Sequence, residues 1–391
     1  MESLNVAFYT DSYLPCVDGV VTSILTFRDE LERRGHNVYI FGSAQSKDKK
    51  RYENRKVFLY SGMKFKPYPQ YSVALFPYNS MIRLNELKTD LVHAQTPLVM
   101  GFAGLMGAKL LKYPIIGTFH TIVANKPVID AYYPKNRHLK KFAARSLMKY
   151  TRFFYNQCDR VIAPSNAIKS MLNGYGISNV STVPNCIDTS RFNPKVNGDA
   201  MRDSLKLNQR NRTVLYLGRL SREKKLEVLL KAVKLLARRD SKLKLIIGGT
   251  GPAEHFYKET VRKLGITDNV KFVGFVSPSS LPKLYAASDV LCLPSTFETQ
   301  GMVTIEAMAT GKPAVGADYL ALSELIRNGV NGEKFRPGDY TDCAKKIEKV
   351  LNNTRRYKNG AVNTAVEFSK EKVTGRLLEV YNSALSDKAI N

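Results

Sequence analysis

The sequence predicts an α/β protein made of two doubly wound domains with parallel sheets. Short apolar runs of strand length alternate with longer amphipathic segments, and this alternating series occurs twice along the chain. Strand–helix alternation is typical of parallel sheets whose two faces are covered by helices. With 391 residues, the chain is long enough for two domains of ordinary size.

The predicted strands fall into an N-terminal and a C-terminal series. The first series comprises residues 5–10, 37–42, 57–60, 91–95, 114–120, 160–165 and 181–185. The second comprises residues 213–220, 243–249, 269–276, 289–295 and 313–318. Helical patterns such as 22–35 and 225–239 separate most of these strands.

The domain boundary is expected in the polar stretch 192–212, which separates the two series. We predict an N-terminal domain over residues 1–192 and a C-terminal domain over 193–370. Residues 371–391 are expected to form a last helix that packs back on the N-terminal domain. In doubly wound sheets, ligands bind beyond the carboxyl ends of the strands, so the loops there are the places to look for chemistry.

Composition narrows the class of protein. Hydrophobic residues make up 44% and charged residues 24%, which is the profile of a globular protein. The 5 cysteines show no C-x-x-C spacing, which indicates reduced core residues in a cytosolic setting and argues against a disulfide framework or a zinc site. Neither a signal peptide nor a membrane-spanning run is expected. We therefore expect a cytoplasmic protein, either soluble or peripheral at the inner face of a membrane.

The charge balance points to an anionic partner. Lys and Arg number 60 against 34 Asp and Glu, a formal net charge of +26. Nucleic acid, an anionic membrane or phosphorylated ligands would each fit such a surface. A generally basic, highly soluble surface is the alternative, and composition does not choose among these.

Two loops of the C-terminal series carry groups suited to phosphate. Arg219 and Lys224 lie at the turn after strand 213–220, where two cations could neutralise a diphosphate. The next strand ends in IIGGTGP, whose glycines allow a close approach of the backbone to a ligand. Pro252 breaks any G-x-G-x-x-G pattern, so this is not a dinucleotide fingerprint.

A pair of acids eight residues apart, Glu298 and Glu306, follows strand 289–295. The intervening Gln300, Gly301 and Met302 are expected to open a helix whose free N–H groups can bind an anion. At about 3.6 residues per turn, Glu306 would lie about two turns from Glu298. Carboxylates at these places can accept hydrogen bonds from sugar or ribose hydroxyls.

Several strings, taken in order, resemble the retaining nucleotide-sugar glycosyltransferases of family 4. They are DSYLPCVDGVVTSI (11–24), APSNAIKSML (163–172), VPNCIDTSRFNP (183–194), GRLSREKKLEVLLKA (218–232), IIGGTGP (246–252) and FETQGMVTIEAMATGKPAV (297–315). The resemblance covers nearly the whole chain and implies GT-B architecture, two Rossmann-like domains facing across a cleft. E-T-Q-G is similar to the branch that glycosylates lipids, such as diacylglycerol glucosyltransferases. Cys186 departs from the glycine usual at its position, and Gly19 stands where many members have two adjacent glycines.

The resemblance implies a role for each matching residue. Arg219 and Lys224 would hold the donor diphosphate, Glu306 the ribose and Glu298 the transferred sugar. His120 would lie near the reaction centre. The implied catalytic residues are His120, Arg219, Lys224 and Glu298. The implied donor-binding residues are Gly19, Gly249, Gly251, Thr299, Gln300, Gly301, Met302 and Glu306.

The reaction expected from this resemblance is hexose transfer, with UDP-glucose as the expected donor and retention of anomeric configuration. No D-x-D motif occurs in the sequence to hold a metal at the diphosphate. We therefore expect no metal or other cofactor, with leaving-group charge stabilised by Arg219, Lys224 and helix N-termini. No protein nucleophile is assigned, and Glu298 is expected to bind sugar.

The acceptor side is expected at a basic amphipathic segment, residues 132–156. It carries no acid, and its basic residues are Lys135, Arg137, Lys140, Lys141, Arg145, Lys149 and Arg152. Leu139, Phe142, Ala143, Leu147 and Tyr150 can share one helical stripe, which suits an anionic membrane surface. The aromatic-basic loop 60–78 could add interfacial anchoring. The simpler interpretation is that the stripe packs on its own domain.

Other functions stay open on the sequence alone. A nucleic-acid-binding protein would explain the charge, although no zinc knuckle, RNP-like string or helix-turn-helix signature accompanies it. Within the enzymes, the acceptor could be a soluble sugar, sugar phosphate or polysaccharide, and the scaffold could also serve a nucleotide-sugar epimerase or hydrolase. The oligomeric state is not indicated.

Overall fold

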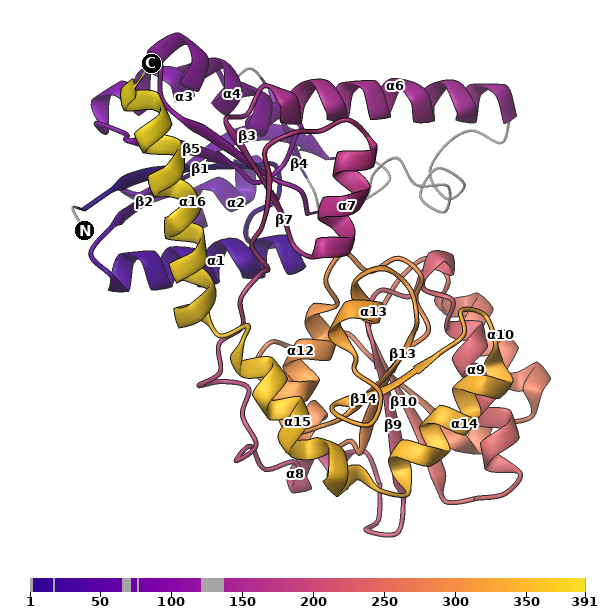
Figure 1. Ribbon diagram of the computed structural model, residues 1–391. Helices are drawn as coiled ribbons and strands as arrows, with labels where there is room; N and C mark the ends of the chain where they lie inside the picture. Colours follow the sequence, from indigo (N-terminus) through magenta and orange to yellow (C-terminus); the bar gives the residue numbers. More distant parts are fainter. Residues whose placement is uncertain (1–2, 17, 65–71, 76, 121–136, 391) are drawn as a thin grey trace. The chain divides into compact units, whose positions relative to one another are not determined.

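The chain folds into two compact units, each with its own parallel sheet (Figure 1). The computed structural model describes residues 3–390 apart from 17, 65–71, 76 and 121–136. The first unit comprises Met1–Cys186 together with Lys370–Asn391, and the second comprises Ile187–Ser369. The predicted α/β class with two doubly wound domains is confirmed.

The elements of the first unit alternate as predicted. In chain order they are β1 (Asn5–Thr10), α1 (Gly19–Arg33), β2 (Asn37–Ala44), α2 (Ser46–Tyr52), β3 (Val57–Lys64), β4 (Ser72–Ala74), α3 (Asn79–Glu86), β5 (Leu91–Ala94), α4 (Val99–Leu111), β6 (Ile115–Thr118), α6 (Arg137–Asn156), β7 (Arg160–Ala163), α7 (Asn166–Gly174), β8 (Val180–Thr182) and α16 (Lys370–Ile390).

The first sheet has eight strands in the order β4-β3-β2-β1-β5-β6-β7-β8, all parallel except β4, which runs antiparallel to β3. One face is covered by α1 and α16, whose apolar side chains pack with Val6, Phe8 and Ile40. The other face carries α4, where Gly104 approaches the ring of Tyr9. The order reverses between β1 and β5, which makes their carboxyl ends the topological switch point of this sheet.

The elements of the second unit follow the same alternation. In chain order they are α8 (Asp199–Ser204), β9 (Arg212–Leu217), η1 (Arg222–Lys224), α9 (Leu226–Ala237), β10 (Leu243–Gly248), α10 (Glu254–Leu264), η2 (Thr267–Asn269), β11 (Val270–Gly274), α11 (Leu281–Ala286), β12 (Val290–Leu293), α12 (Met302–Ala309), β13 (Ala314–Ala317), α13 (Leu320–Leu325), β14 (Gly332–Phe335), α14 (Tyr340–Leu351) and α15 (Thr354–Val366).

The second sheet has six parallel strands in the order β11-β10-β9-β12-β13-β14. Its inner strands β12 and β13 are continuous apolar runs because both of their faces are buried. Val214, Leu215 and Ile246 are fully buried, and the core extends through α9, α12 and α14. Here the strand order reverses between β9 and β12, which is the switch point of the second unit.

The polar stretch 192–212 is not the crossing between the units, contrary to the sequence-based expectation. The chain crosses at Cys186–Ile187 and again at Ser369–Lys370. Ile187 N–H donates to the carbonyl of Phe368 at 2.9 Å, which joins the two crossing segments. Within the polar stretch, Arg202 Nη1 donates to the Ala287 carbonyl at 2.8 Å. Its polarity is therefore that of a surface segment bonded to the second unit.

Two strands were missed from the sequence. β14 carries Glu333 inside a short run, Gly332–Phe335, that lacks the apolar pattern of the other strands. β4 falls in the segment 60–78, which was expected to be an aromatic-basic loop and instead contains the end of β3 and all of β4. Residues 65–71 and 76 of that segment lie outside the described residues.

The C-terminal helix α16 packs on the first unit through a buried polar chain as well as apolar contacts. Tyr381 Oη lies 2.7 Å from His93 Nδ1, and His93 Nε2 lies 2.6 Å from Thr118 Oγ1. Burial, with a smaller contribution from His120, lowers the pKa of His93 to about 3. The imidazole is therefore neutral at pH 7 and links α16 to β5 and β6 through two hydroxyls.

Tyr381→Phe should lower the free energy of unfolding of the first unit by about 1–3 kcal/mol, because it leaves a buried imidazole nitrogen without its hydroxyl partner. Tyr175→Phe, at a residue 37% exposed, is the matched control and should change stability by less than about 0.5 kcal/mol. Urea unfolding followed by circular dichroism measures both. Equal effects of the two substitutions would show that the Tyr381–His93 contact does not hold α16 in place.

Candidate active site

Apart from Gly19, which lies in the first unit, the residues predicted to bind the donor lie in loops at or beside the switch point of the second unit and in helix α12. Arg219 lies in the loop after β9, and Glu298 lies in the loop after β12. These loops are joined by an ion pair, in which Lys224 Nζ lies 2.8 Å from Glu298 Oε1. The two side chains are only 21% and 16% exposed, so water screens this pair less than a surface pair.

Two buried tyrosines fix the loop after β9. Tyr216 Oη donates to the Arg219 carbonyl at 3.2 Å, and Tyr257 Oη donates to the Ser221 carbonyl at 2.9 Å. The short helix η1 then presents Lys224 to the loop after β12. The backbone of the loop that carries Arg219 and Lys224 is thus fixed by hydrogen bonds from one side chain of β9 and one of α10.

The glycines of IIGGTGP are required by the protein's own backbone. A Cβ on Gly249, whose φ is +117°, would lie 2.0 Å from the Gly218 carbonyl oxygen. A Cβ on Gly251 would lie 2.4 Å from the Leu220 carbonyl oxygen. The sequence predicted a close approach of this backbone to a ligand, and the structure shows that the glycines also let the loop after β10 pack against the loop after β9.

Helix α12 begins later than expected, at Met302, with Gly301 as its N-cap residue at φ +82°. Gln300 is not in the first turn; it precedes the N-cap and is 4% exposed. Glu306 lies about one turn into α12, and Glu298 lies in the loop before the helix, so the expected separation by two helical turns is wrong. The N–H groups of Met302 and Val303 head the helix.

Glu306 is a buried carboxyl group, 7% exposed, in the second unit. Tyr285 Oη donates to its Oε2 at 2.7 Å. Burial raises the pKa of Glu306 to about 7, and the hydrogen bond from Tyr285 and the charge of Arg191 only partly oppose this rise. The group is thus poised to be half ionised near neutral pH.

Tyr285 and Arg191 are site residues that the sequence did not reveal. Arg191 stacks on Phe192, with Cζ 4.7 Å from the ring centroid, and donates to the Pro278 carbonyl. Phe192 in turn packs edge-on against Tyr285. Arg191 lies within the VPNCIDTSRFNP string that carried the resemblance, which was the available signal, whereas nothing in SLPKLYAASD marked Tyr285.

The first unit has polar groups at its own switch point, between β1 and β5. Asp11, after β1, is 5% exposed and accepts hydrogen bonds from Thr96 Oγ1 at 2.5 Å and from Met100 N at 2.9 Å. Burial raises the pKa of this carboxyl group, and the hydrogen bonds oppose it. Asp11 thereby ties the loop after β5 to the start of α4.

His120 follows β6, and its Nε2 lies 2.9 Å from Gln95 Oε1. Burial lowers the pKa of His120 to about 4, with Asp18 opposing, so the ring is neutral at pH 7. Gln95 is 1% exposed, and its Nε2 has no partner among the described residues. Because Gln95 Oε1 can only accept, His120 Nε2 carries the proton of the neutral ring and Nδ1 carries the lone pair.

Gly19 is the first residue of α1 and is exposed. Asp18 caps this helix, accepting from Val21 N at 2.8 Å. A Cβ on Gly19 would meet nothing within 4 Å. The helix start is therefore open on the side of this residue, as an anion-binding role requires.

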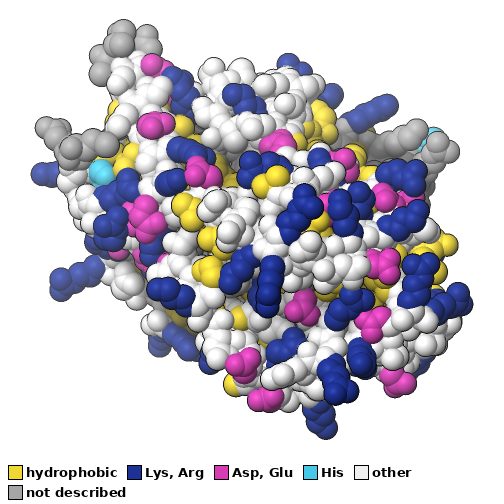
Figure 2. All heavy atoms as spheres, turned by 60° about the horizontal axis from the view of Figure 1, so that its bottom comes forward, with side chains coloured by type: hydrophobic (Ala, Val, Ile, Leu, Met, Phe, Trp, Pro, Cys, Tyr) yellow, Lys and Arg dark blue, Asp and Glu magenta, His cyan; other side chains and the backbone are white. Residues whose placement is uncertain are grey.

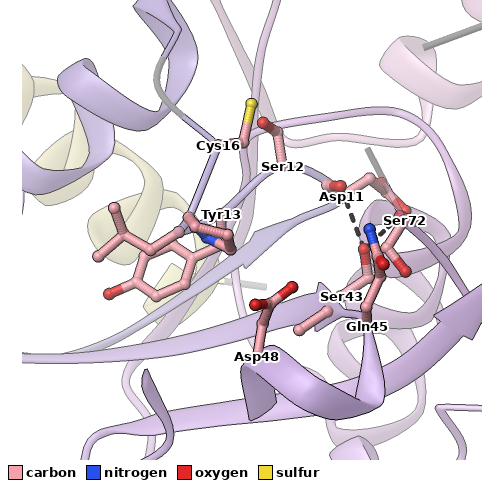
Figure 3. A pocket seen from close by; sticks show the side chains of 11 residues that line it. Asp11, Ser12, Tyr13, Cys16, Ser43, Gln45, Asp48 and Ser72 are labelled. Atoms are coloured by element: carbon pink, nitrogen blue, oxygen red, sulfur yellow. Dashed lines mark hydrogen bonds between the residues drawn. The ribbon is translucent and has the colours of Figure 1, made fainter. Parts of the chain in front are cut away.

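A polar hollow lies at the carboxyl ends of β1 and β2 (Figure 3). The close-up shows Asp48 from α2 and Gln45 directed toward it, with Ser12 and Cys16 on its rim. Ser43 Oγ donates to the Asp11 carbonyl at 3.1 Å and to the Ser72 carbonyl. Hydroxyl and carboxylate groups of this kind can bind a polyhydroxylated ligand. The sequence did not single out this hollow.

The basic segment forms helix α6, Arg137–Asn156. Arg137, Lys140 and Lys141 lie within it, whereas Lys135 is outside the described residues. The side chains of Arg145, Lys149 and Arg152 are exposed.

The predicted apolar stripe of α6 is divided. Phe142 is 70% exposed, but Tyr150 Oη donates to the Pro97 carbonyl at 2.5 Å. Ala143 and Leu147 are half-buried. The simpler interpretation, packing on its own domain, therefore holds at the end of the stripe near Tyr150, and Phe142 faces outward.

Basic side chains are spread widely over the face in Figure 2, with acidic side chains interspersed among them.

Among the described residues, no three His, Cys, Asp or Glu side chains come close enough to hold a metal ion. No described helix combines the length and apolar character needed to cross a membrane. All five cysteines are buried and free, as predicted.

The free energy of unfolding of the second unit should fall as pH rises from about 4.5 through about 7. In that range the folded chain retains the Glu306 proton and the unfolded chain releases it. A pKa rise from 4.5 to about 7 corresponds to about 3 kcal/mol. Glu306→Gln cannot titrate and should lack this loss, which chemical unfolding at several pH values measures.

Glu324→Gln, at an exposed carboxylate of the same unit, is the control and should keep the pH dependence of the unsubstituted protein. A Glu306→Gln profile that matches that of the unsubstituted protein would contradict the assignment.

Two family models match successive parts of the chain. The family model described as Glycosyltransferase Family 4 matches residues 17–191, and the model described as Glycosyl transferases group 1 matches residues 197–384. The chain is 29% identical to an alpha-monoglucosyldiacylglycerol synthase of Streptococcus pneumoniae, over 98% of this chain and 86% of that protein. It is 30% identical to a D-inositol 3-phosphate glycosyltransferase of Actinosynnema mirum, over 75% and 72%.

Solved structures show the same architecture. Anabaena Alr3699/HepE in complex with UDP-glucose matches with a TM-score of 0.76 at 21% identity, over 97% of this chain and 100% of that one. The predicted GT-B fold, with two Rossmann-like domains, is confirmed by this likeness and by the two sheets described above. From its family models, its relatives and this fold, the chain belongs to the family 4 glycosyltransferases and is a glycosyltransferase of the branch that resembles the diacylglycerol glucosyltransferases.

Proposed function

We propose that this glycosyltransferase transfers glucose from UDP-glucose to a membrane lipid, with retention of anomeric configuration and without a metal ion. The observation that carries the proposal is the Lys224–Glu298 ion pair at the switch point of the second sheet. It brings a phosphate-binding cation and a hydroxyl-binding carboxylate to the place where a doubly wound sheet binds its ligand.

The donor diphosphate is bound by Arg219 and Lys224, which come from one loop. Arg offers a forked pair of donors to phosphate oxygens, and Lys adds a point charge. The N-terminus of α12 contributes its N–H groups and its dipole. These groups stabilise the negative charge that grows on the diphosphate as the bond to the sugar breaks.

Each acid binds a different part of the donor. Tyr285 occupies Glu306 Oε2, which leaves Oε1 of that carboxylate to accept from the ribose hydroxyls. Glu298 and Thr299 accept from hydroxyls of the transferred hexose. Glu298 is assigned to binding hydroxyls, and no protein nucleophile is assigned.

Retention follows from attack on the face that the diphosphate leaves. The bond between the anomeric carbon and the phosphate oxygen breaks, and the acceptor hydroxyl oxygen bonds to that carbon on the same face. The departing phosphate takes the hydroxyl proton, so no protein base is needed. Neutral His120 donates or accepts a hydrogen bond near the transferred sugar without carrying charge.

A lipid acceptor is supported by the relatives and by charge. The Streptococcus pneumoniae relative is named for a glucosyldiacylglycerol product. The exposed Arg145, Lys149 and Arg152 of α6 provide attraction for anionic lipid headgroups, at about 1 kcal/mol for each residue near the surface. Peripheral attachment at the cytoplasmic face of a membrane follows from the proposal.

An activity screen tests the reaction. The purified protein is incubated with UDP- or GDP-sugars and with either lipid extract or soluble sugars and sugar phosphates, in parallel reactions with and without EDTA. We expect a glycolipid from UDP-glucose, identified by mass spectrometry. Transfer to soluble acceptors only would overturn the lipid assignment, loss of activity in EDTA would overturn metal independence, and donor consumption without transfer would indicate a hydrolase or epimerase.

Lys224→Gln should lower kcat/KM for the donor about 10²–10³-fold, because one of the charges that stabilises the leaving group is lost. Lys225→Gln is the matched control, since Lys225 is the next residue, is exposed and has no ion-pair partner among the described residues. It should retain activity within about threefold. Steady-state kinetics with varied donor measures both, and equal losses would remove Lys224 from the site.

A further inference from the structure

Helix α4 carries a row of exposed apolar side chains along its outer face. Leu98, Phe102, Met106 and Leu110 are 48%, 40%, 42% and 67% exposed. A spacing of four residues places Phe102, Met106 and Leu110 on one side of the helix, in a row about 12 Å long at 1.5 Å per residue, and Leu98 is the N-cap residue that precedes them. We call these four residues the α4 stripe.

The opposite side of α4 packs against the rest of the first unit. Gly104 lies against Tyr9, and Gly107 lies against Leu84 of α3. The helix is therefore apolar on both its inner and its outer face. A helix that is apolar all round is ordinarily covered on every side, and in this unit the outer side is not.

The α4 stripe is flanked by basic residues along the chain, and helix α3, which packs against α4, adds the exposed Arg83 and Glu86. No Asp or Glu occurs among the described residues between Leu91 and Cys158. Lys109 and Lys112 lie at the carboxyl end of α4 and are exposed. The same stretch of sequence includes α6, with its exposed basic residues.

Helix α6 lies beside the beginning of α4 (Figure 1). A Cβ on Gly101 of α4 would lie 3.4 Å from the ring of Phe154 of α6, and Tyr150 bonds to the Pro97 carbonyl. The two helices therefore form one surface, in which apolar side chains of α4 are accompanied by basic side chains of α6.

We propose that the α4 stripe inserts into the headgroup region of an anionic bilayer and is the element that seats this enzyme on its lipid substrate. This rests on the proposed lipid acceptor. An anionic bilayer satisfies both halves of the surface, since its hydrocarbon boundary takes the stripe and its headgroups pair with Lys and Arg. A second copy of the chain would bring together two surfaces in which Lys and Arg predominate, which like charges oppose.

The position of the stripe links the bilayer to the candidate site. Leu98 begins the stripe, and it follows Gln95 and Thr96 in the loop after β5. Gln95 contacts His120, and Thr96 bonds to Asp11. A lipid whose acyl chains contact Phe102 therefore presents its headgroup toward the switch point of the first sheet.

The absence of tryptophan from this chain allows a direct test. Phe102→Trp places the sole tryptophan in the α4 stripe, and Phe275→Trp places it at an exposed position, 63% accessible, in the second unit as a control. With vesicles containing phosphatidylglycerol, we expect a blue shift for Phe102→Trp and quenching by brominated acyl chains, but neither for Phe275→Trp. Vesicles of phosphatidylcholine alone should give a weaker response because the charge attraction is lost.

A second measurement uses loss of the apolar surface. The triple variant Phe102→Gln, Met106→Gln, Leu110→Gln should reduce partitioning onto phosphatidylglycerol vesicles at least about tenfold in sedimentation. Phe275→Gln with Val330→Gln and Val366→Gln removes three equally exposed side chains elsewhere and should not. Circular dichroism checks that each variant is folded.

Three outcomes would overturn the inference. One is vesicle binding of Phe102→Trp without a spectral shift, which would place another surface on the membrane. Another is a lipid-independent dimer that the triple variant dissociates, which would make the stripe an interface between copies. The third is the absence of any vesicle binding. A failure of this inference can be distinguished from a failure of the proposed function, because the fluorescence and sedimentation measurements do not depend on formation of a glycolipid.

Discussion

The Lys224–Glu298 ion pair is the contact on which the candidate donor site depends. It joins the loops that follow β9 and β12, the adjacent strands between which the sheet order reverses. Because the pair is partly buried, it holds both loops in a defined geometry before any ligand arrives. In the proposed function, a diphosphate that engages Lys224 competes with Glu298, and the released carboxylate is then free for a sugar hydroxyl. The proposal therefore couples donor binding to sugar recognition through one contact.

The framework around this pair is built from packing that has no direct role in chemistry. Tyr216 and Tyr257 fix the carbonyls of the loop that carries the cations. Gly249 and Gly251 allow the next loop to lie against it without a side chain between the backbones. Glu306 is also shielded from water in this unit. Burial raises its pKa to about 7 and makes its charge sensitive to pH near neutrality.

The sequence predicted well those features that depend on local pattern. Strands such as β1 and β10 are continuous apolar runs buried on both faces, so their positions follow from periodicity. The exception is informative, since β14 carries the buried Glu333 and lacks that pattern. Glu333 is accommodated by contacts from Lys349, at 2.7 Å, and Tyr357, at 3.0 Å, that only the folded structure brings together.

For the candidate site, too, the sequence indicated some features and not others. Glu298, Glu306 and Lys224 stand in strings that resemble a family, so their importance was visible. Their mutual geometry was not, because Lys224 and Glu298 are 74 residues apart in sequence. Tyr285 and the α4 stripe escaped notice for a physical reason: an apolar or aromatic residue in a helix normally belongs to the core, and only the exposed fraction or the hydrogen-bond partner reveals another role.

The most direct test of the account is the affinity of UDP for the unsubstituted protein and for Glu298→Gln, Lys224→Gln and the double variant, measured by titration calorimetry. If Glu298 competes with the diphosphate for Lys224, Glu298→Gln should bind UDP more tightly than the unsubstituted protein, and Lys224→Gln should bind it at least about tenfold more weakly. The double variant should then resemble Lys224→Gln. Weaker binding in both single variants to the same extent would contradict the account, because it would make the ion pair a structural unit and leave Lys224 without a part in holding the diphosphate.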